Sequence, residues 1–308
     1  MELTDVLKPE YLFQPKVALL RLLPFKTKLK SEFVEKVLPW GTKLRLRPLE
    51  EHGQILLTLG VIDLTVTETL WRLTDPGSVA VDVGANIGYM TGVLASRVET
   101  QSGGKIWAFE AHPDIFKELT YNTRELQSQF PNTNFYIEHK AVSDKEGCIQ
   151  LGIPEGFSEN QGLAFVMNSE NELNKSNMKD IKTISVQSVS LDGVFPSPSK
   201  IDILKLDVEG HELTVLKGAE KLITQGRIRD CVFEEHRDYP TPVTQYLKDN
   251  GYEIFRIQRS LFKPLLLSPD SEVPKTKWLP TSFLATKDAT RATERFQKAG
   301  WQVLKKNS

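Results

Sequence analysis

A glycine turn and a later acidic residue form the most informative chemical pattern in this sequence. The turn, Gly84-Ala-Asn-Ile-Gly88, follows the apolar stretch Val79–Val83, and Glu110 comes 22 residues after Gly88, at the end of a second apolar stretch. A strand that ends in glycines and turns into a helix presents backbone N–H groups to a ligand. An acidic side chain after the next strand can accept hydrogen bonds from both hydroxyls of a ribose. The pattern therefore predicts a nucleoside cofactor.

The residues around the turn distinguish between cofactors. A dinucleotide site favours G-x-G-x-x-G, but Asn86 stands where the second glycine would be. Asp82, just before the turn, would repel a pyrophosphate and attract the ammonium of an amino-acid tail. S-adenosylmethionine has that ammonium, a ribose and no phosphate, so we expect it rather than NAD, with S-adenosylhomocysteine as product. Tyr89, at the start of the following helix, is expected to lie beside the cofactor.

Acids and histidines follow two later apolar stretches. Asp207, Glu209 and His211 come after the first, and Glu235 and His236 end the second. The carboxyl ends of parallel strands meet at one sheet edge, so these groups are candidates for a general base, a substrate anchor or a metal ligand. We predict His236 or His211 as the base for a hydroxyl acceptor, with Asp207 and Glu235 as orienting groups. The acids Asp207, Glu209 and Glu235 could instead bind a divalent ion through oxygen, but a metal is not favoured.

The elements that position these residues form an alternating pattern of strands and helices. The strands are apolar with little alternation, which is typical of a mostly parallel sheet buried on both faces. Two stretches, Tyr252–Ile257 and Ser282–Thr286, are predicted to close the sheet as an antiparallel pair. The expected organisation is an N-terminal arm or cap at 1–60, a catalytic domain at 61–288 with a polar lid or flexible insertion at 155–180, and a C-terminal helix and tail at 289–308.

Composition excludes several classes of protein. The 308 residues are 40% hydrophobic and 26% charged, the mix of a globular protein rather than of a disordered chain or a fibre. A net charge of -1 argues against nucleic-acid binding, and the apolar stretches are too short to span a membrane. The two cysteines, Cys148 and Cys231, are too few for a disulfide framework. We therefore expect a cytoplasmic monomer or homodimer that acts on a small-molecule or peptide acceptor.

The sequence resembles the FkbM family of S-adenosylmethionine-dependent methyltransferases over roughly residues 38–290. The stretches that carry the resemblance are 81–89, 108–113, 141–144, 190–192 and 203–219, the last with the specific Asp207-Val-Glu-Gly-His-Glu element. One departure is Ala111, where the family usually has proline. The resemblance implies an α/β, Rossmann-like class I methyltransferase fold: a mixed seven-stranded sheet with helices on both faces.

The resemblance also implies roles for individual residues. Carried over by position, the methionine end of the cofactor would be held by Asp82, Gly84, Asn86 and Gly88. Glu110, with Ala111 beside it, would hold the ribose; apart from the resemblance, a carboxylate such as Asp207 near the sulfonium would offset its positive charge. The adenine would be flanked by Ala141, Val142 and Asp144.

The reaction implied is methylation of a small molecule, most often at a hydroxyl of a sugar or a secondary metabolite. An N-methyltransferase that acts on a peptide side chain or an amine in natural-product biosynthesis remains an alternative. A NAD-type oxidoreductase fits less well because of Asn86 and Asp82. A binding module without catalysis fits less well because acids would have no reason to gather at both strand ends.

Overall fold

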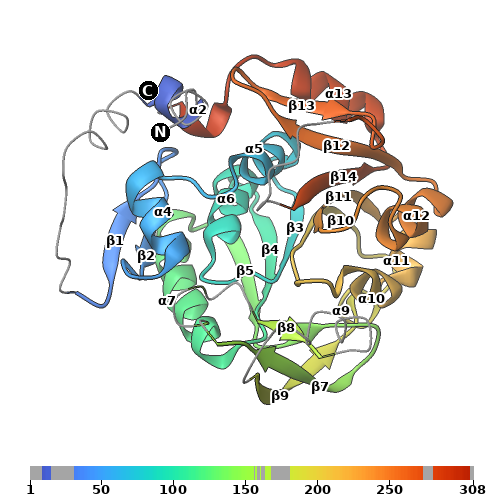
Figure 1. Ribbon diagram of the computed structural model, residues 1–308, viewed down its shortest axis with the longest axis horizontal. Coiled ribbons are helices and arrows are strands. Elements are labelled where there is room, and N and C mark those ends of the chain that lie inside the picture. Colours follow the sequence, from blue (N-terminus) through green and yellow to red (C-terminus); the bar gives the residue numbers. More distant parts are fainter. Residues whose placement is uncertain are drawn as a thin grey trace.

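The main feature of the fold is an eight-stranded sheet (Figure 1). The computed structural model describes residues 9–14, 31–155, 157, 160, 164–167, 181–272 and 280–305. The strand order is β13-β12-β14-β11-β10-β3-β4-β5. In chain order the strands are β3 (Val79–Val83), β4 (Gly104–Phe109), β5 (Thr133–Glu138), β10 (Ile201–Leu206), β11 (Ile228–Glu235), β12 (Glu253–Arg259), β13 (Pro264–Leu267) and β14 (Thr281–Thr286).

The directions of the strands confirm a mixed sheet. The five strands β5, β4, β3, β10 and β11 are mutually parallel, and β14 pairs antiparallel with both β11 and β12. The predicted antiparallel closing pair is therefore β12 and β14. The eighth strand, β13, extends the expected seven by pairing antiparallel with β12 at the sheet edge.

Helices cover both faces of this sheet, as the unbroken apolar strands predict. One face packs against α5 (Leu64–Leu73), α6 (Tyr89–Val98) and α7 (Pro113–Gln129), and the other against α10 (Glu212–Lys217), α11 (Glu220–Thr224) and α12 (Pro242–Asp249). A short helix, α9 (Leu191–Val194), precedes β10. Adjacent residues of a strand pack into opposite cores: Ala80 lies in the core with α5, α6 and α7, and Val81 lies in the core with α10, α11 and α12.

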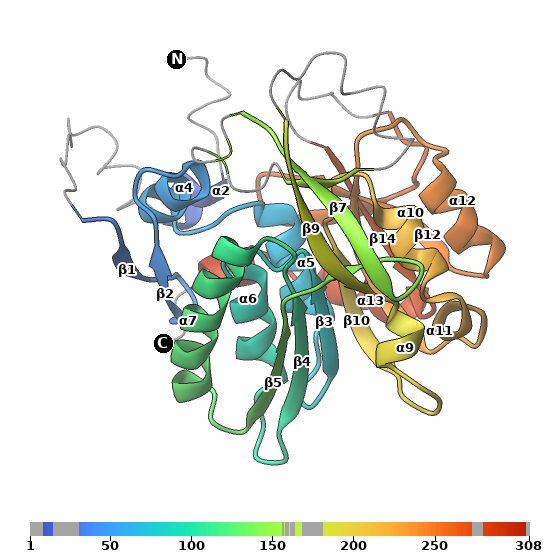
Figure 2. The same ribbon diagram turned by 90° about the horizontal axis from the view of Figure 1, so that it is seen from below.

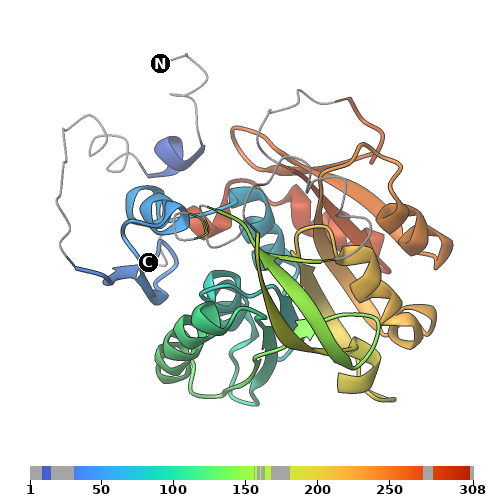
Figure 3. The same cartoon turned by 60° about the horizontal axis from the view of Figure 1, so that its bottom comes forward.

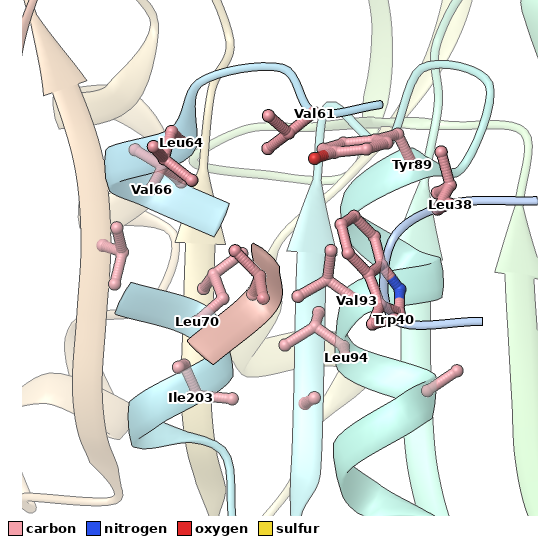
Figure 4. Close-up of a cluster of buried hydrophobic side chains, with 14 of the residues drawn as sticks. Leu38, Trp40, Val61, Leu64, Val66, Leu70, Tyr89, Val93, Leu94 and Ile203 are labelled. Atoms are coloured by element: carbon pink, nitrogen blue, oxygen red, sulfur yellow. The ribbon is translucent and has the colours of Figure 1, made fainter. Parts of the chain in front are cut away.

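The N-terminal region shares the core of the main sheet. Its described elements are α2 (Pro9–Phe13), the antiparallel pair β1 (Val34–Val37) and β2 (Lys43–Leu46), and α4 (Glu51–Leu59). Figure 4 shows Trp40 and Leu38 beside Tyr89, and the rings of Trp40 and Tyr89 are 5.7 Å apart between centroids. Among the described helices, none alone has the length and apolar composition to span a membrane. The helices α4 and α5 reach that length and composition only together, and a 70° bend separates them.

A second, four-stranded sheet lies between β5 and β10 in the chain (Figures 2 and 3). Its order is β6-β9-β7-β8, with β6 (Ala141–Val142), β7 (Gly147–Ile153), β8 (Phe165–Val166) and β9 (Lys182–Val189). The sequence did not predict this sheet, because β6 and β8 have only two residues each and the polar stretch 155–180 separates β7 from β9. Most of the predicted lid at 155–180 lies outside the described residues.

The C-terminal segment is held by two buried charges of α5. The predicted helix begins at Ala289 but ends at Gln297 as α13, and a 3₁₀ turn follows at Gln302–Leu304 after Gly300, whose φ is +84°. Arg72 donates to the carbonyls of Arg295, Lys298 and Gly300 at 2.6–2.9 Å. Its partner Glu68, 2.7 Å away, accepts from the amides of Gln302 and Val303.

Replacing Arg72 with methionine is expected to lower the free energy of unfolding by about 3–5 kcal/mol, because Glu68 would remain buried without its cation. Urea denaturation measures the change. The double variant Glu68→Gln, Arg72→Met should recover part of the loss, because it also removes the uncompensated charge. A loss below about 1 kcal/mol for the single variant would contradict the role given to Arg72.

Candidate functional site

A cavity lies at the carboxyl ends of β3, β4 and β10. Residues predicted from the sequence supply much of its wall, and the second sheet and the N-terminal region supply the rest. The predicted residues that line it are Gly84, Asn86, Tyr89, Glu110, Ala111, Ala141, Val142, Asp207, Glu209 and His211. The structure therefore brings most of the predicted cofactor residues and part of the predicted acceptor-side group into one cavity wall.

The buried cation Lys205 connects the two halves of this site. It lies in β10, in register with Asp82 of β3, and its Nζ donates to the carbonyl of Gly84 at 2.8 Å. The same Nζ is 3.3 Å from Oδ1 of Asp82 and 3.4 Å from Oδ2 of Asp207. Burial lowers the pKa of Lys205, but Asp207 and Asp82 outweigh this and raise it above the ordinary value. Lys205 therefore stays charged and ties the glycine turn to the loop after β10.

Asp82, which the sequence analysis expected to attract the cofactor's ammonium, faces Lys205 instead of the cavity. Asp82 is fully buried and does not line the cavity, and its Oδ2 accepts from Oγ1 of Thr91 at 2.7 Å. A carboxylate with no exposed surface stabilises Lys205 rather than a ligand. Gly88 is also not part of the cavity wall, because it packs on α7: a Cβ there would be 2.9 Å from Cδ1 of Leu119.

The glycine turn is a close contact between two backbone segments. Gly84 has a φ of +74°, and a Cβ added to it would lie 1.9 Å from the carbonyl oxygen of Asp207. Asn86 also has a positive φ, of +51°, and its Oδ1 accepts from the amide of Ile87 at 2.7 Å. Glycine is thus required at 84 because the strand ends meet there, and the asparagine side chain supports the bend at 86.

Glu110 faces the turn from the end of β4. Its Oε2 accepts from the amide of Asn86 at 2.9 Å, and its Oε1 accepts from the amide of His112 at 2.8 Å. Burial raises the pKa of Glu110 to about 7, although both amide bonds lower it. Each oxygen keeps further lone-pair capacity for a hydroxyl donor. The carboxyl therefore fits the ribose role that its sequence position predicts.

The second sheet forms an apolar wall of the cavity. Ala141 and Val142 of β6 lie there with Leu151, Ala164 and Val166, which no sequence motif marked. The predicted neighbour Asp144 is not part of this wall: it lines an adjacent hollow, and its Oδ1 accepts from Oγ of Ser143 at 3.2 Å. The wall suits a flat, apolar ring, whereas Asp144 has no contact with this cavity.

The loop after β10 supplies the acids of the acceptor side. The side chain of Asp207 is 43% exposed, so it combines contact with Lys205 and access to the cavity. Burial and the charges of Asp207 and Glu212 raise the pKa of Glu209 to about 8. His211 lines the cavity but is buried, with its Nε2 3.1 Å from Oγ of Ser143.

The residues predicted after β11 lie outside the cavity. Glu235 forms an ion pair with Arg237 at 3.0 Å. His236 is 63% exposed, with its Nε2 3.8 Å from Oε2 of Glu209. The preceding residue, Glu234, does not line the cavity either; burial and the hydrogen-bonded carboxyl of Asp63 raise its pKa, Asp207 raises it further, and Lys205 lowers it. Glu235, predicted as an orienting group, therefore lies outside the cavity wall.

The sequence analysis missed several further residues of the cavity. His52 comes from α4 and Ile62 from the segment between α4 and α5, and Met90 and Lys140 also line the wall. The N-terminal region was expected only as an arm, and no motif in it indicated a site. Across the part of the chain that the structure describes, no three His, Cys, Asp or Glu side chains are grouped as metal ligands.

Comparisons with known proteins give a family match and more distant likenesses. Residues 82–254 match the model of the methyltransferase FkbM domain. Hexuronic acid methyltransferase AglP of Haloferax volcanii is 27% identical over 222 residues, which are 72% of this chain and 82% of that protein.

Among solved structures, a methyltransferase FkbM from Methylobacillus flagellatus is 14% identical, with a TM-score of 0.41. The match covers 73% of this chain, which spans only 55% of the length of that protein. A putative methyltransferase from Streptococcus mutans, in complex with SAH, is 11% identical, with a TM-score of 0.37 and coverage of 72% of this chain and 94% of that chain.

The close contact at Gly84 predicts the effect of adding one methyl group. We expect Gly84→Ala to cost about 1–2 kcal/mol for its left-handed backbone and a further 1–3 kcal/mol for the overlap with Asp207. Gly226→Ala is a matched control, because Gly226 has a φ of +62° but no atom within 4 Å of an added Cβ. Urea denaturation of both variants should therefore show a larger loss for Gly84→Ala. Equal losses would contradict the requirement for close approach at Gly84.

Proposed function

The chain belongs to the FkbM methyltransferase family, and from this premise we propose that it transfers a methyl group from S-adenosylmethionine to a hydroxyl of a sugar or another small molecule. The observation that carries the proposal is the placement of Glu110, whose buried carboxyl faces the glycine turn inside one cavity with Asp207. That arrangement suits a nucleoside at one end and an acceptor at the other. The relative that methylates a hexuronic acid supports a carbohydrate as the class of acceptor.

The proposed cofactor contacts follow from the cavity wall. Glu110 would accept from the ribose hydroxyls, Ala141 and Val142 would pack on the adenine, and the turn at Gly84 would hold the amino-acid end. S-adenosylmethionine supplies a methyl carbon made electrophilic by a positively charged sulfur. The partly exposed carboxyl of Asp207 would offset that positive charge at short range.

The chain has two tasks toward the acceptor. It must hold the acceptor oxygen in line with the methyl carbon, which supplies much of the rate, and it must remove the hydroxyl proton. Asp207 and Glu209 are acceptors for the neighbouring hydroxyls of a sugar ring. The charge of Asp207 would attract an amine, so N-methylation of an amine or a peptide side chain remains the second candidate.

S-adenosylmethionine should raise the midpoint of thermal unfolding, and NAD should not. A ligand present at 100 times its Kd stabilises the native state by about 2.7 kcal/mol. Methyl glucoside, methyl glucuronide and methyl glucosaminide then test the acceptor, with transfer followed by mass spectrometry. Methylation of a ring hydroxyl is the expected product. Stabilisation by NAD alone would overturn the proposal, and methylation only at nitrogen would favour the second candidate.

The pKa of Glu110 predicts how cofactor binding depends on pH. Above pH 7 the carboxylate accepts from the ribose, whereas below pH 7 a proton must first be removed, so the affinity falls as the pH falls. Between about pH 8 and pH 6 we expect the affinity for S-adenosylhomocysteine to drop about tenfold, in a calorimetric titration. Glu110→Gln should bind more weakly, with this dependence lost. A pH-independent affinity of the unmodified chain would contradict the ribose role.

A further inference from the structure

His52 reaches the cavity from the N-terminal region. It lies in the first turn of α4 and lines the same wall as Asn86 and Asp207. The start of this helix is held closely, because a Cβ on Gly53 would be 1.8 Å from the carbonyl oxygen of Arg47, at the end of β2. Buried Leu56 anchors the helix in the core shared with α5 and α6. His52 is thus placed by rigid packing, while its side chain remains 33% exposed.

A buried carboxylate lies behind the imidazole of His52. Glu50 is 6% exposed, and its Oε2 caps α4 by accepting from the amide of Gly53 at 2.8 Å. Its other oxygen, Oε1, is buried, has no hydrogen-bond partner, and is 3.9 Å from Nδ1 of His52. An unsatisfied buried acceptor costs about 1–3 kcal/mol. A small rotation of the imidazole would bring its Nδ1–H to this oxygen and leave Nε2 directed away from Glu50.

The other four histidines contact other groups or lie outside the cavity wall. His211 is buried against Ser143, and His112 caps α7 by accepting from the amide of Asp114. His139 contacts the carbonyl of Ala111, and His236 does not line the cavity. Two histidines lie in the cavity wall, and His52 has the carboxylate of Glu50 on its far side.

We propose that His52 is the catalytic base that takes the proton of the acceptor hydroxyl, and that Glu50 is the positioning residue that orients it. The inference rests on the proposed methyl transfer. The acceptor oxygen forms the new bond to the methyl carbon, the carbon–sulfur bond breaks, and its electron pair stays on sulfur. The hydroxyl proton passes to Nε2 of His52, and Glu50 stabilises the imidazolium through Nδ1–H. A base and an orienting carboxylate are the recurring pair for this task, and their hydrogen bond often tightens only when substrate binds.

The test compares His52→Ala, Glu50→Gln and Glu51→Gln with the unmodified chain, using the sugar that it methylates. His52→Ala should lower kcat by about 10²–10⁴-fold and leave the affinity for S-adenosylhomocysteine unchanged. Added imidazole should restore part of the activity, which a merely structural role would not allow. Glu50→Gln keeps an oxygen to cap Gly53 but loses the charge, so its kcat should fall to between that of the unmodified chain and that of His52→Ala. Glu51→Gln removes the same charge one residue away and should leave activity unchanged.

The outcomes separate this inference from the proposed function. Full activity of His52→Ala, or a parallel loss of S-adenosylhomocysteine binding without rescue by imidazole, would overturn the role of His52 and leave the methyl transfer standing. If the unmodified chain binds S-adenosylmethionine but methylates no hydroxyl, the proposed function fails and the base assignment fails with it.

Discussion

One buried cation holds the two sides of the site together. Lys205 contacts Asp82, Asp207 and the carbonyl of Gly84, so a single ammonium fixes the distance between the glycine turn and the loop after β10. A charge removed from water is tolerated only where opposite charges and carbonyls surround it. Because Lys205 contacts both strand ends, the glycine turn and the loop after β10 meet at one edge of the cavity.

The part of the site near the glycine turn could be predicted because it is encoded locally. A glycine after an apolar strand and an acid after the next strand define a position relative to the sheet, and Gly84 and Glu110 both line the cavity. The differences between prediction and structure concern the side of the sheet on which a residue lies. In a sheet buried on both sides, adjacent residues point to opposite cores, and sequence alone does not show that Glu235 lies outside the cavity wall. For the same reason, sequence alone does not show that Asp82 is buried and paired with Lys205 on the neighbouring strand.

The remaining walls depend on contacts between segments that are distant in the chain. The second sheet pairs β7 with β9 across the polar stretch 155–180, and only the folded chain reveals this pairing. His52 belongs to no motif that indicated a site, and its place in the wall depends on the contact between Gly53 and Arg47 and on the packing of α4 against the main core. Such placement follows from tertiary packing rather than from local pattern.

The docking of the C-terminal segment on α5 has a consequence for biosynthesis. Arg72 meets its carbonyl partners 223–228 residues later, so a ribosome must add most of the chain before those bonds can form. In the meantime Glu68, one helical turn away, can neutralise Arg72 within α5 itself. The nascent helix α5 thus contains a counter-ion for Arg72. The charge of Arg72 is therefore paired before the C-terminal carbonyls that accept from it have been synthesised.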